Sequence, residues 1–509
     1  MRRRHRVLDE SDLKYAPGVG ARVSPSQRPL RPLEWAVLLH LGIYLVAITW
    51  GFGGGAESLR SLLAWWGSIG LLLMLTALQD REARKEGWLR PVFWLWPFVA
   101  FNLLVAAGCL NPSFREIKFG AETLLVNDGA RPGLPSSARP ALAWQALWFF
   151  DAIWISCFNL ALVIRQRRAL RGLLLVAACN ALALAIFGTV QKLTHARGLF
   201  FDAFASPQSY FFASFIYHNH WGSFMVLMMA ACLGLLWHYA RRHESRDFFH
   251  SPVFGGLVTV LLLAATVPLS TSRSCTALTV LLLGGAWLHW IGRLIKQRRR
   301  YHESIALPLG GAVAAVVLAA AGVWFVARES IVMRVAVTRE QVEEMRALGG
   351  IGSRAVLYEN TLSMAKDKLW FGWGMASYPH VFTIYNTRVP GSDRLPVFYH
   401  DAHSDWLQSF AEHGLVGTAL LGLCGLVPLL RLRRRHLEGM LPSYLLTGCA
   451  LVLLYAWVEF PFGNLAVVFS WWLCFFCAVQ YGRLRDREAP SPTKPERSAA
   501  LTSPDAAPV

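Results

Sequence analysis

Apolar runs as long as a membrane-spanning helix recur along most of this chain of 509 residues. Such a helix needs about 20 apolar residues, and only helices or closed barrels satisfy their backbone hydrogen bonds in lipid. The runs are continuous rather than alternating, which favours helices over a barrel. We therefore predict an all-α integral membrane protein with twelve spans, near 33–51, 58–79, 91–110, 141–164, 172–190, 219–240, 252–270, 274–292, 305–327, 414–430, 441–460 and 463–482.

Basic residues indicate how these spans are oriented. If the N-terminus is cytoplasmic, the positive-inside rule expects every second loop to be basic. Clusters of Lys and Arg at 81–90, 165–171, 241–246, 293–300 and 431–435 follow that alternation without a break. We predict that both termini are cytoplasmic, and we interpret the net charge of +18 as a topology signal. No nucleic-acid partner is expected.

The tails and the cysteines exclude further classes. The basic N-terminal segment has no apolar core followed by a cleavage site, so it is not a cleavable signal peptide. All nine cysteines lie in or beside apolar runs, so we expect neither disulfides nor a cysteine metal site. The predicted divisions are a cytoplasmic tail 1–32, transmembrane helices 33–190 and 191–327, a periplasmic catalytic loop 328–413, transmembrane helices 414–482 and a disordered cytoplasmic tail 483–509.

The long loop between spans nine and ten has a pattern of its own. A helical face near 357–369 precedes the glycine turn Phe371-Gly-Trp-Gly-Met375, and 376–400 looks irregular. A second helix is predicted to start near His403 and to run into the span that begins at Gly414. The other predicted outer loops are 52–57, 111–140, 191–218, 270–274 and 459–464.

Two arginines are candidate anion ligands. Arg273 sits in a tight outer turn between two spans, where an ionisable residue is costly and is a functional candidate by default; the alternative is an arginine that snorkels to the interface. Arg354 opens the helix of the long loop, where a free helix N-terminus attracts anions and a guanidinium grips phosphate. A solvated surface arginine is the alternative there.

His403 is the candidate base, because histidine titrates near neutral pH and can take a proton from a hydroxyl. Asp401 or Asp405 could orient it. His400 and His413 raise a metal-binding alternative with Asp401, but the spacing lacks the i, i+4 geometry of helical zinc pairs. A histidine satisfied by local backbone groups is a third reading.

Further polar residues lie near this predicted site or inside a span. His218, Asn219 and His220 open span six and could line a pocket or sit in the interface. Glu412 is a further supporting candidate within the predicted second helix. Asp151 lies within span four, where an unpaired carboxylate is costly.

Four stretches together carry a family pattern. Residues 353–378 are similar to a helix opening with S/G-R that leads into "kD-PLFGvG", and 402–417 to "HN-x-x-L-q-x-x-x-E-x-G-x-x-G". Residues 217–224 resemble an "N-H-x-A-G" segment, and Ser272-Arg273 resembles an "S-R" turn. In order and membrane placement these motifs resemble the O-antigen ligase and polymerase superfamily. Ser404 departs from the usual Asn, and Lys368-Leu369-Trp370 from the usual Pro-Leu.

The resemblance implies a metal-independent membrane glycosyltransferase without a cofactor, in the bacterial inner membrane, with a periplasmic active site. Its donor would be a glycan on undecaprenyl diphosphate, and its acceptor a hydroxyl of lipopolysaccharide core or a similar glycan, lipid or protein. Arg273 and Arg354 would hold the diphosphate, and His403 would activate the acceptor hydroxyl. Membrane lipids would surround the enzyme.

The same residues also fit other functions. A repeat-unit polysaccharide polymerase would use the same chemistry with a second lipid-linked glycan as acceptor, and a protein O-glycosyltransferase would use a side-chain hydroxyl. A small-anion transporter would place charged residues along the spans. Asp151 is the clearest such residue, whereas most polar candidates gather at the outer face, which favours an enzyme.

Overall fold

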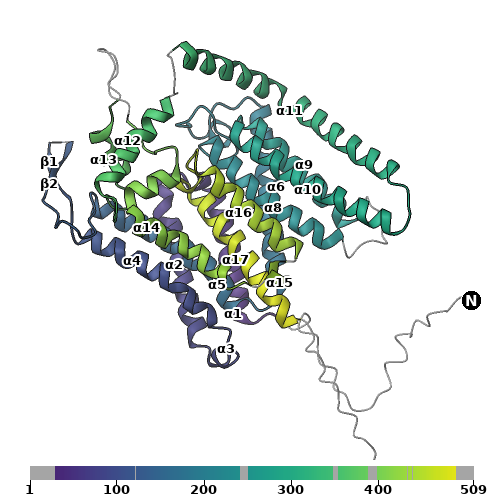
Figure 1. The fold of residues 1–509 in the computed structure, drawn as a ribbon, viewed down its shortest axis with the longest axis horizontal. Helices are drawn as coiled ribbons and strands as arrows, with labels where there is room; N and C mark the ends of the chain where they lie inside the picture. The colour runs from purple at the N-terminus through teal and green to yellow at the C-terminus, as the bar shows by residue number, and fades with distance from the viewer. Residues whose placement is uncertain are drawn as a thin grey trace, which may run out of the picture.

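The computed structural model describes residues 29–120, 122–240, 250–347, 353–387, 398–432, 434–437 and 439–488, and these ranges are mostly helical (Figure 1). Most of both predicted terminal tails lies outside them. Every predicted span coincides with a helix. These helices are α1 (Pro32–Trp50), α2 (Glu57–Gln79), η3 with α4 (Arg90–Leu95, Trp96–Cys109), α5 (Pro140–Val163), α6 (Arg167–Leu193), α8 (His218–Ala240), α9 (Pro252–Leu269), α10 (Arg273–Arg300), α11 (Ala306–Ala347), α14 (Asp405–Leu430), α16 (Met440–Tyr455) and α17 (Leu465–Glu488).

Ten helices in the described ranges are long and apolar enough to cross a membrane. Helix α16, with 16 residues, and the apolar part of α11, Ala306–Gly322, are shorter. The chain is therefore an all-α polytopic membrane protein, while the count of twelve spans stays a prediction. Figure 1 shows α11 running along the outside of the bundle, well past the predicted span end at residue 327.

Helices α5, α8 and α17 form the centre of the bundle. Trp154 of α5 stacks on Phe158 at 4.8 Å and meets Phe476 of α17 edge-on at 5.6 Å. Small residues let α2 approach the same helix closely, and Ser156 of α5 donates to the carbonyl oxygen of Gly67 of α2 at 3.0 Å. Such close van der Waals packing and interhelical hydrogen bonds are what hold helices together in lipid.

One end of the bundle, which we call the site end, is formed by the start of α8, the start of α10, and the α16–α17 loop. It also carries α12 (Ser353–Asp367) and α13 (Tyr378–Tyr385), together with the short elements η2 (Phe52–Gly54), α7 (Leu199–Asp202), η5 (Pro461–Gly463), β1 (Phe114–Phe119) and β2 (Glu122–Asn127). The short helices α3 (Arg81–Lys85) and α15 (Arg434–Leu437) lie toward the opposite end (Figure 1).

Three local expectations need correction. Strands β1 and β2 form an antiparallel hairpin in the loop 111–140, for which no strand was predicted. Helix α13 lies inside the stretch 376–400 that looked irregular, whereas α14 begins at Asp405, close to its predicted start near His403. The apolar face predicted for α12 is buried at Leu357 and Ala365, but Leu362 on that face is 38% exposed.

Helix α14 breaks at Gly414 (φ 64°, ψ −169°). The turn at 369–374 runs alongside the break and satisfies the backbone groups there: Leu415 N–H donates to Leu369 O at 2.9 Å, and Gly374 N–H donates to Glu412 O at 2.8 Å. A side chain at Gly414 would stand 2.5 Å from the carbonyl oxygen of Trp370. Only glycine fits this backbone, so the glycine turn and α14 form one locked unit.

Candidate active site

Three side chains from distant parts of the chain meet at the site end. Glu459, in the loop between α16 and α17, is 3% exposed and forms an ion pair through Oε1 with Arg354 of α12. Its other oxygen, Oε2, lies 3.4 Å from Nδ1 of His403. Arg354 also donates through Nη1 to Val458 O at 2.9 Å, and its side chain stays half exposed. The result is a carboxylate flanked by an arginine and a histidine.

His403 sits just before α14 in a left-handed backbone conformation (φ 50°), which is uncommon for a residue other than glycine. The Tyr358 hydroxyl donates to the carbonyl oxygen of His403 at 2.9 Å, and the Phe460 ring meets the imidazole edge-on at 5.0 Å. Ser404 caps α14 by accepting from Leu407 N–H at 3.4 Å, so it does the work that the usual Asn could do. His403 is thus fixed on several sides.

The electrostatics of the site follow from these contacts. Burial raises the pKa of the Glu459 carboxyl, but the hydrogen bond from His403 and the charge of Arg354 outweigh burial and hold that pKa below its usual range. Burial alone would lower the pKa of Arg354, yet the neighbouring Glu459 charge raises it. Glu459 is therefore ionised in this arrangement, and Arg354 remains a cation.

The two aspartates proposed as partners of His403 have other contacts. Asp405 accepts from Phe462 N–H at 2.8 Å, and its own N–H donates to Glu459 O at 3.2 Å, so it braces the loop that carries Glu459. Asp401 lies beside η5, and burial raises its pKa despite the nearby His403. The carboxylate that hydrogen-bonds to the His403 ring is Glu459.

The start of α8 joins the site through Phe460. His220 Nε2 lies 3.2 Å from Phe460 O, and the Tyr217 ring stacks on the Phe460 ring at 5.4 Å. Asn219 donates to the Tyr217 hydroxyl at 2.8 Å and accepts from Ser272 Oγ at 2.6 Å. His218 faces the other way, toward Tyr210 O at 3.3 Å.

Arg273 reaches the same end because α10 begins with it, directly after Ser272. The two helix starts approach closely: a side chain at Gly222 of α8 would collide with Cys275 of α10. The Arg273 side chain is exposed. The structure therefore brings Arg273, Arg354, His403 and the 217–220 segment to one end of the bundle.

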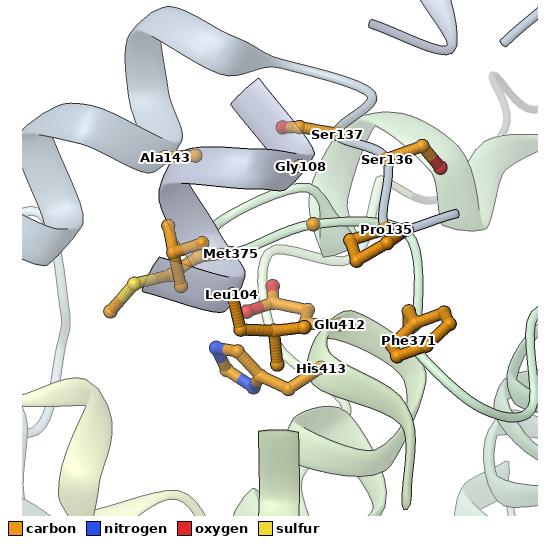
Figure 2. A pocket seen from close by; sticks show the side chains of 12 residues that line it. Leu104, Gly108, Pro135, Ser136, Ser137, Ala143, Phe371, Met375, Glu412 and His413 are labelled. Carbon is orange, nitrogen blue, oxygen red and sulfur yellow. The ribbon is translucent and has the colours of Figure 1, made fainter. Parts of the chain in front are cut away.

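Glu412 has a structural contact instead. Its carboxylate accepts from Ala376 N–H and Tyr378 N–H, both at 3.0 Å, which fastens the glycine turn to α14. Glu412 and His413 line a small cavity of about 20 Å³. Figure 2 shows them with Met375, Leu104 and the 135–137 segment, which also line it. His413 packs on Phe101 of α4 at 5.3 Å, so it faces the bundle.

Within the described ranges, no group of three or more His, Cys, Asp or Glu side chains is placed to hold a metal ion. Asp151 of α5 accepts a hydrogen bond from Asn102 of α4 at 3.1 Å, which gives the intramembrane carboxylate a polar partner. Arg60 of α2 is a further cation, and its charge acts on Asp401 and His220. No sequence motif pointed to Arg60.

Glu459 is the functional candidate that sequence reasoning missed. One feature could have indicated it: Glu459 is one of two carboxylates, with Glu57, in the short predicted outer loops 52–57, 270–274 and 459–464. Its partners lie 56 and 105 residues away along the chain, and such separations cannot be read from local spacing.

A many-helix bundle with a histidine, a carboxylate and arginines gathered at one end defines a polytopic membrane protein with a polar site at that end. Residues 257–422 match the protein family described as O-antigen ligase, and this match supports membership of the O-antigen ligase superfamily. The match includes Arg273, Arg354 and His403 but neither the 217–220 segment nor Glu459. No curated protein matched the chain. The match supports a membrane glycosyltransferase of the ligase or polymerase type.

Proposed function

We propose that this protein is a ligase-type glycosyltransferase that transfers a glycan from undecaprenyl diphosphate to an acceptor hydroxyl, such as one on lipopolysaccharide core, at the periplasmic face of the bacterial inner membrane. The observation that carries the proposal is the contact of His403 Nδ1 with a buried carboxylate, beside Arg354. This arrangement leaves Nε2 of the imidazole to take a proton from the acceptor.

The two arginines suit the leaving group. Diphosphate gains negative charge as its bond to the sugar breaks, and preorganised cations stabilise that charge. Arg354 has five N–H donors, and only part of its half-exposed guanidinium is used by Glu459 and Val458. Arg273 supplies a second exposed guanidinium at the site end. A single displacement would invert the anomeric carbon, which product stereochemistry would test.

A membrane bundle suits a lipid-linked donor. The polyprenyl tail would lie among the spans while its diphosphate stays at the site end. We propose that this end faces the periplasm, with both termini cytoplasmic, because the basic loops alternate in that sense. The proposed reaction needs neither a metal nor a cofactor, since the arginines and His403 supply the charges and the base.

The test is the glycan profile of a deletion strain complemented with wild type or with His403→Ala. Accumulation of long glycan on undecaprenyl diphosphate, and its absence from the final acceptor, would identify a ligase. Accumulation of single repeat units would identify a polymerase, and unmodified protein acceptors would identify a protein O-glycosyltransferase. Full rescue by His403→Ala would refute the proposed base and reopen the transporter hypothesis.

A further inference from the structure

Glu459 is shared between two groups that the proposed reaction uses differently. One carboxylate oxygen pairs with Arg354 and the other faces His403. The loop that carries it is held from both sides, since Asp405 accepts from Phe462 N–H at 2.8 Å and His220 lies 3.2 Å from Phe460 O. A buried carboxylate fixed in this way cannot turn toward solvent to satisfy its charge.

The carboxylate also determines which ring nitrogen of His403 is protonated. An ionised carboxylate only accepts hydrogen bonds, so Nδ1 must donate, and the lone pair is then on Nε2. The Tyr358 hydroxyl on His403 O and the Phe460 ring restrict the imidazole further. The geometry thus presents one defined basic nitrogen.

We infer that Glu459 is a positioning residue, which fixes His403 with its proton on Nδ1 and couples acceptor deprotonation to departure of the diphosphate through Arg354. The inference rests on the transfer proposed above and names a residue outside the segment that matches the family.

The proposed step balances as follows. The acceptor hydroxyl proton passes to Nε2 of His403 while the acceptor oxygen bonds to the anomeric carbon. The bond from that carbon to the diphosphate oxygen breaks, and its electron pair stays on the leaving group. His403 is now an imidazolium and draws more strongly on Glu459. The ion pair between Arg354 and Glu459 then weakens, so that Arg354 can interact more strongly with the diphosphate, which has just gained charge.

Several other titratable groups face Glu459 and His403, and the experiment must separate their effects from that of Glu459. Arg354 and Tyr358 come from α12, and Tyr217 and His220 from the start of α8. Asp401 and Asp405 approach from the segment around His403. Tyr455 lies at the end of α16, and Cys275 lies at the start of α10. Arg60 of α2 acts indirectly, through Asp401 and His220. The aspartates are the direct competitors for the positioning role.

The first experiment measures transfer by purified protein against pH for wild type, Glu459→Gln, Glu459→Asp, Asp401→Asn and Asp405→Asn. Glu459→Gln should lower kcat by roughly 10²-fold, with a much smaller change in KM for the donor. The acid limb of its kcat–pH profile should move to lower pH, because the His403 imidazolium loses its adjacent negative charge. Glu459→Asp should recover part of kcat. An unmoved limb in Glu459→Gln, or the same shift in either aspartate variant, would overturn the inference.

A second readout does not need transferase activity. Modification of His403 by diethyl pyrocarbonate is followed by mass spectrometry against pH, with the exposed His195 as an internal reference. Glu459→Gln should move the midpoint for His403 to lower pH and leave that for His195 in place. A shift in a protein without transferase activity would uphold the positioning role and refute the proposed function. An unchanged His403 midpoint in an active enzyme would refute the positioning role alone.

Discussion

The break in α14 makes a strong stability prediction for Gly414→Ala. The backbone there has φ 64° and ψ −169°, a region essentially reserved for glycine, which costs another residue about 1–3 kcal/mol. The new Cβ would also stand 2.5 Å from Trp370 O, and forced overpacking costs about 1–3 kcal/mol. We expect the free energy of unfolding to fall by about 2–6 kcal/mol, the sum of these two ranges.

The matched control is Gly422→Ala in the same helix. No atom lies within 4 Å of the position that a Cβ at Gly422 would occupy, so alanine should be neutral or should stabilise the helix by up to about 1 kcal/mol. Unfolding of both variants is measured by SDS titration in mixed micelles with tryptophan fluorescence. Equal stability of the two variants would show that the glycine turn and α14 are not locked together.

The remaining predictions concern charge. Lys368 donates to Ser113 and Ser136, and burial lowers its pKa to about 8, whereas the unfolded lysine titrates near 10.4. The contribution of Lys368 to stability should therefore be lost as pH falls toward 8, so the stability difference between wild type and Lys368→Met should change between pH 8 and 10. A pH-independent difference would argue against this prediction. Arg273→Lys should retain part of the donor affinity and Arg273→Ala little, because lysine keeps the charge but not the bidentate fork; equal KM values for donor in both variants would remove Arg273 from the site. Asp151→Asn should fold and transfer nearly as wild type, since the amide can still pair with Asn102, and complete loss of transfer in correctly inserted protein would indicate a role in chemistry.

The helices could be predicted because membrane spans have a length and composition that a single sequence displays. Arg354 and His403 could also be singled out, because each begins or precedes a helix next to a long polar interval. The partner of His403 could not: Asp401 and Asp405 are nearer in sequence, but the fold turns Asp405 toward Phe462 N–H and brings in Glu459. Neighbourhood along the chain favours the two aspartates over Glu459, since a loop contact 56 residues away leaves no periodic pattern.

The hairpin β1–β2 and the break at Gly414 were missed for related reasons. Short strands paired only with each other give little alternation to detect, and α14 reads as one continuous apolar helix after its polar start. The glycine turn was found, but its backbone partners on α14 were not, because hydrogen bonds between main-chain atoms depend little on residue type.

The position of Glu459 limits how this enzyme can be divided. The family signature ends at residue 422, and the carboxylate that holds its histidine and arginine comes from a loop that begins more than 30 residues later. A graft of 257–422 onto another scaffold would carry the recognisable motifs without the group that orients them. Engineered chimaeras should therefore exchange the α16–α17 hairpin together with the signature segment, and relatives with divergent C-terminal hairpins should differ in activity even where their motifs agree.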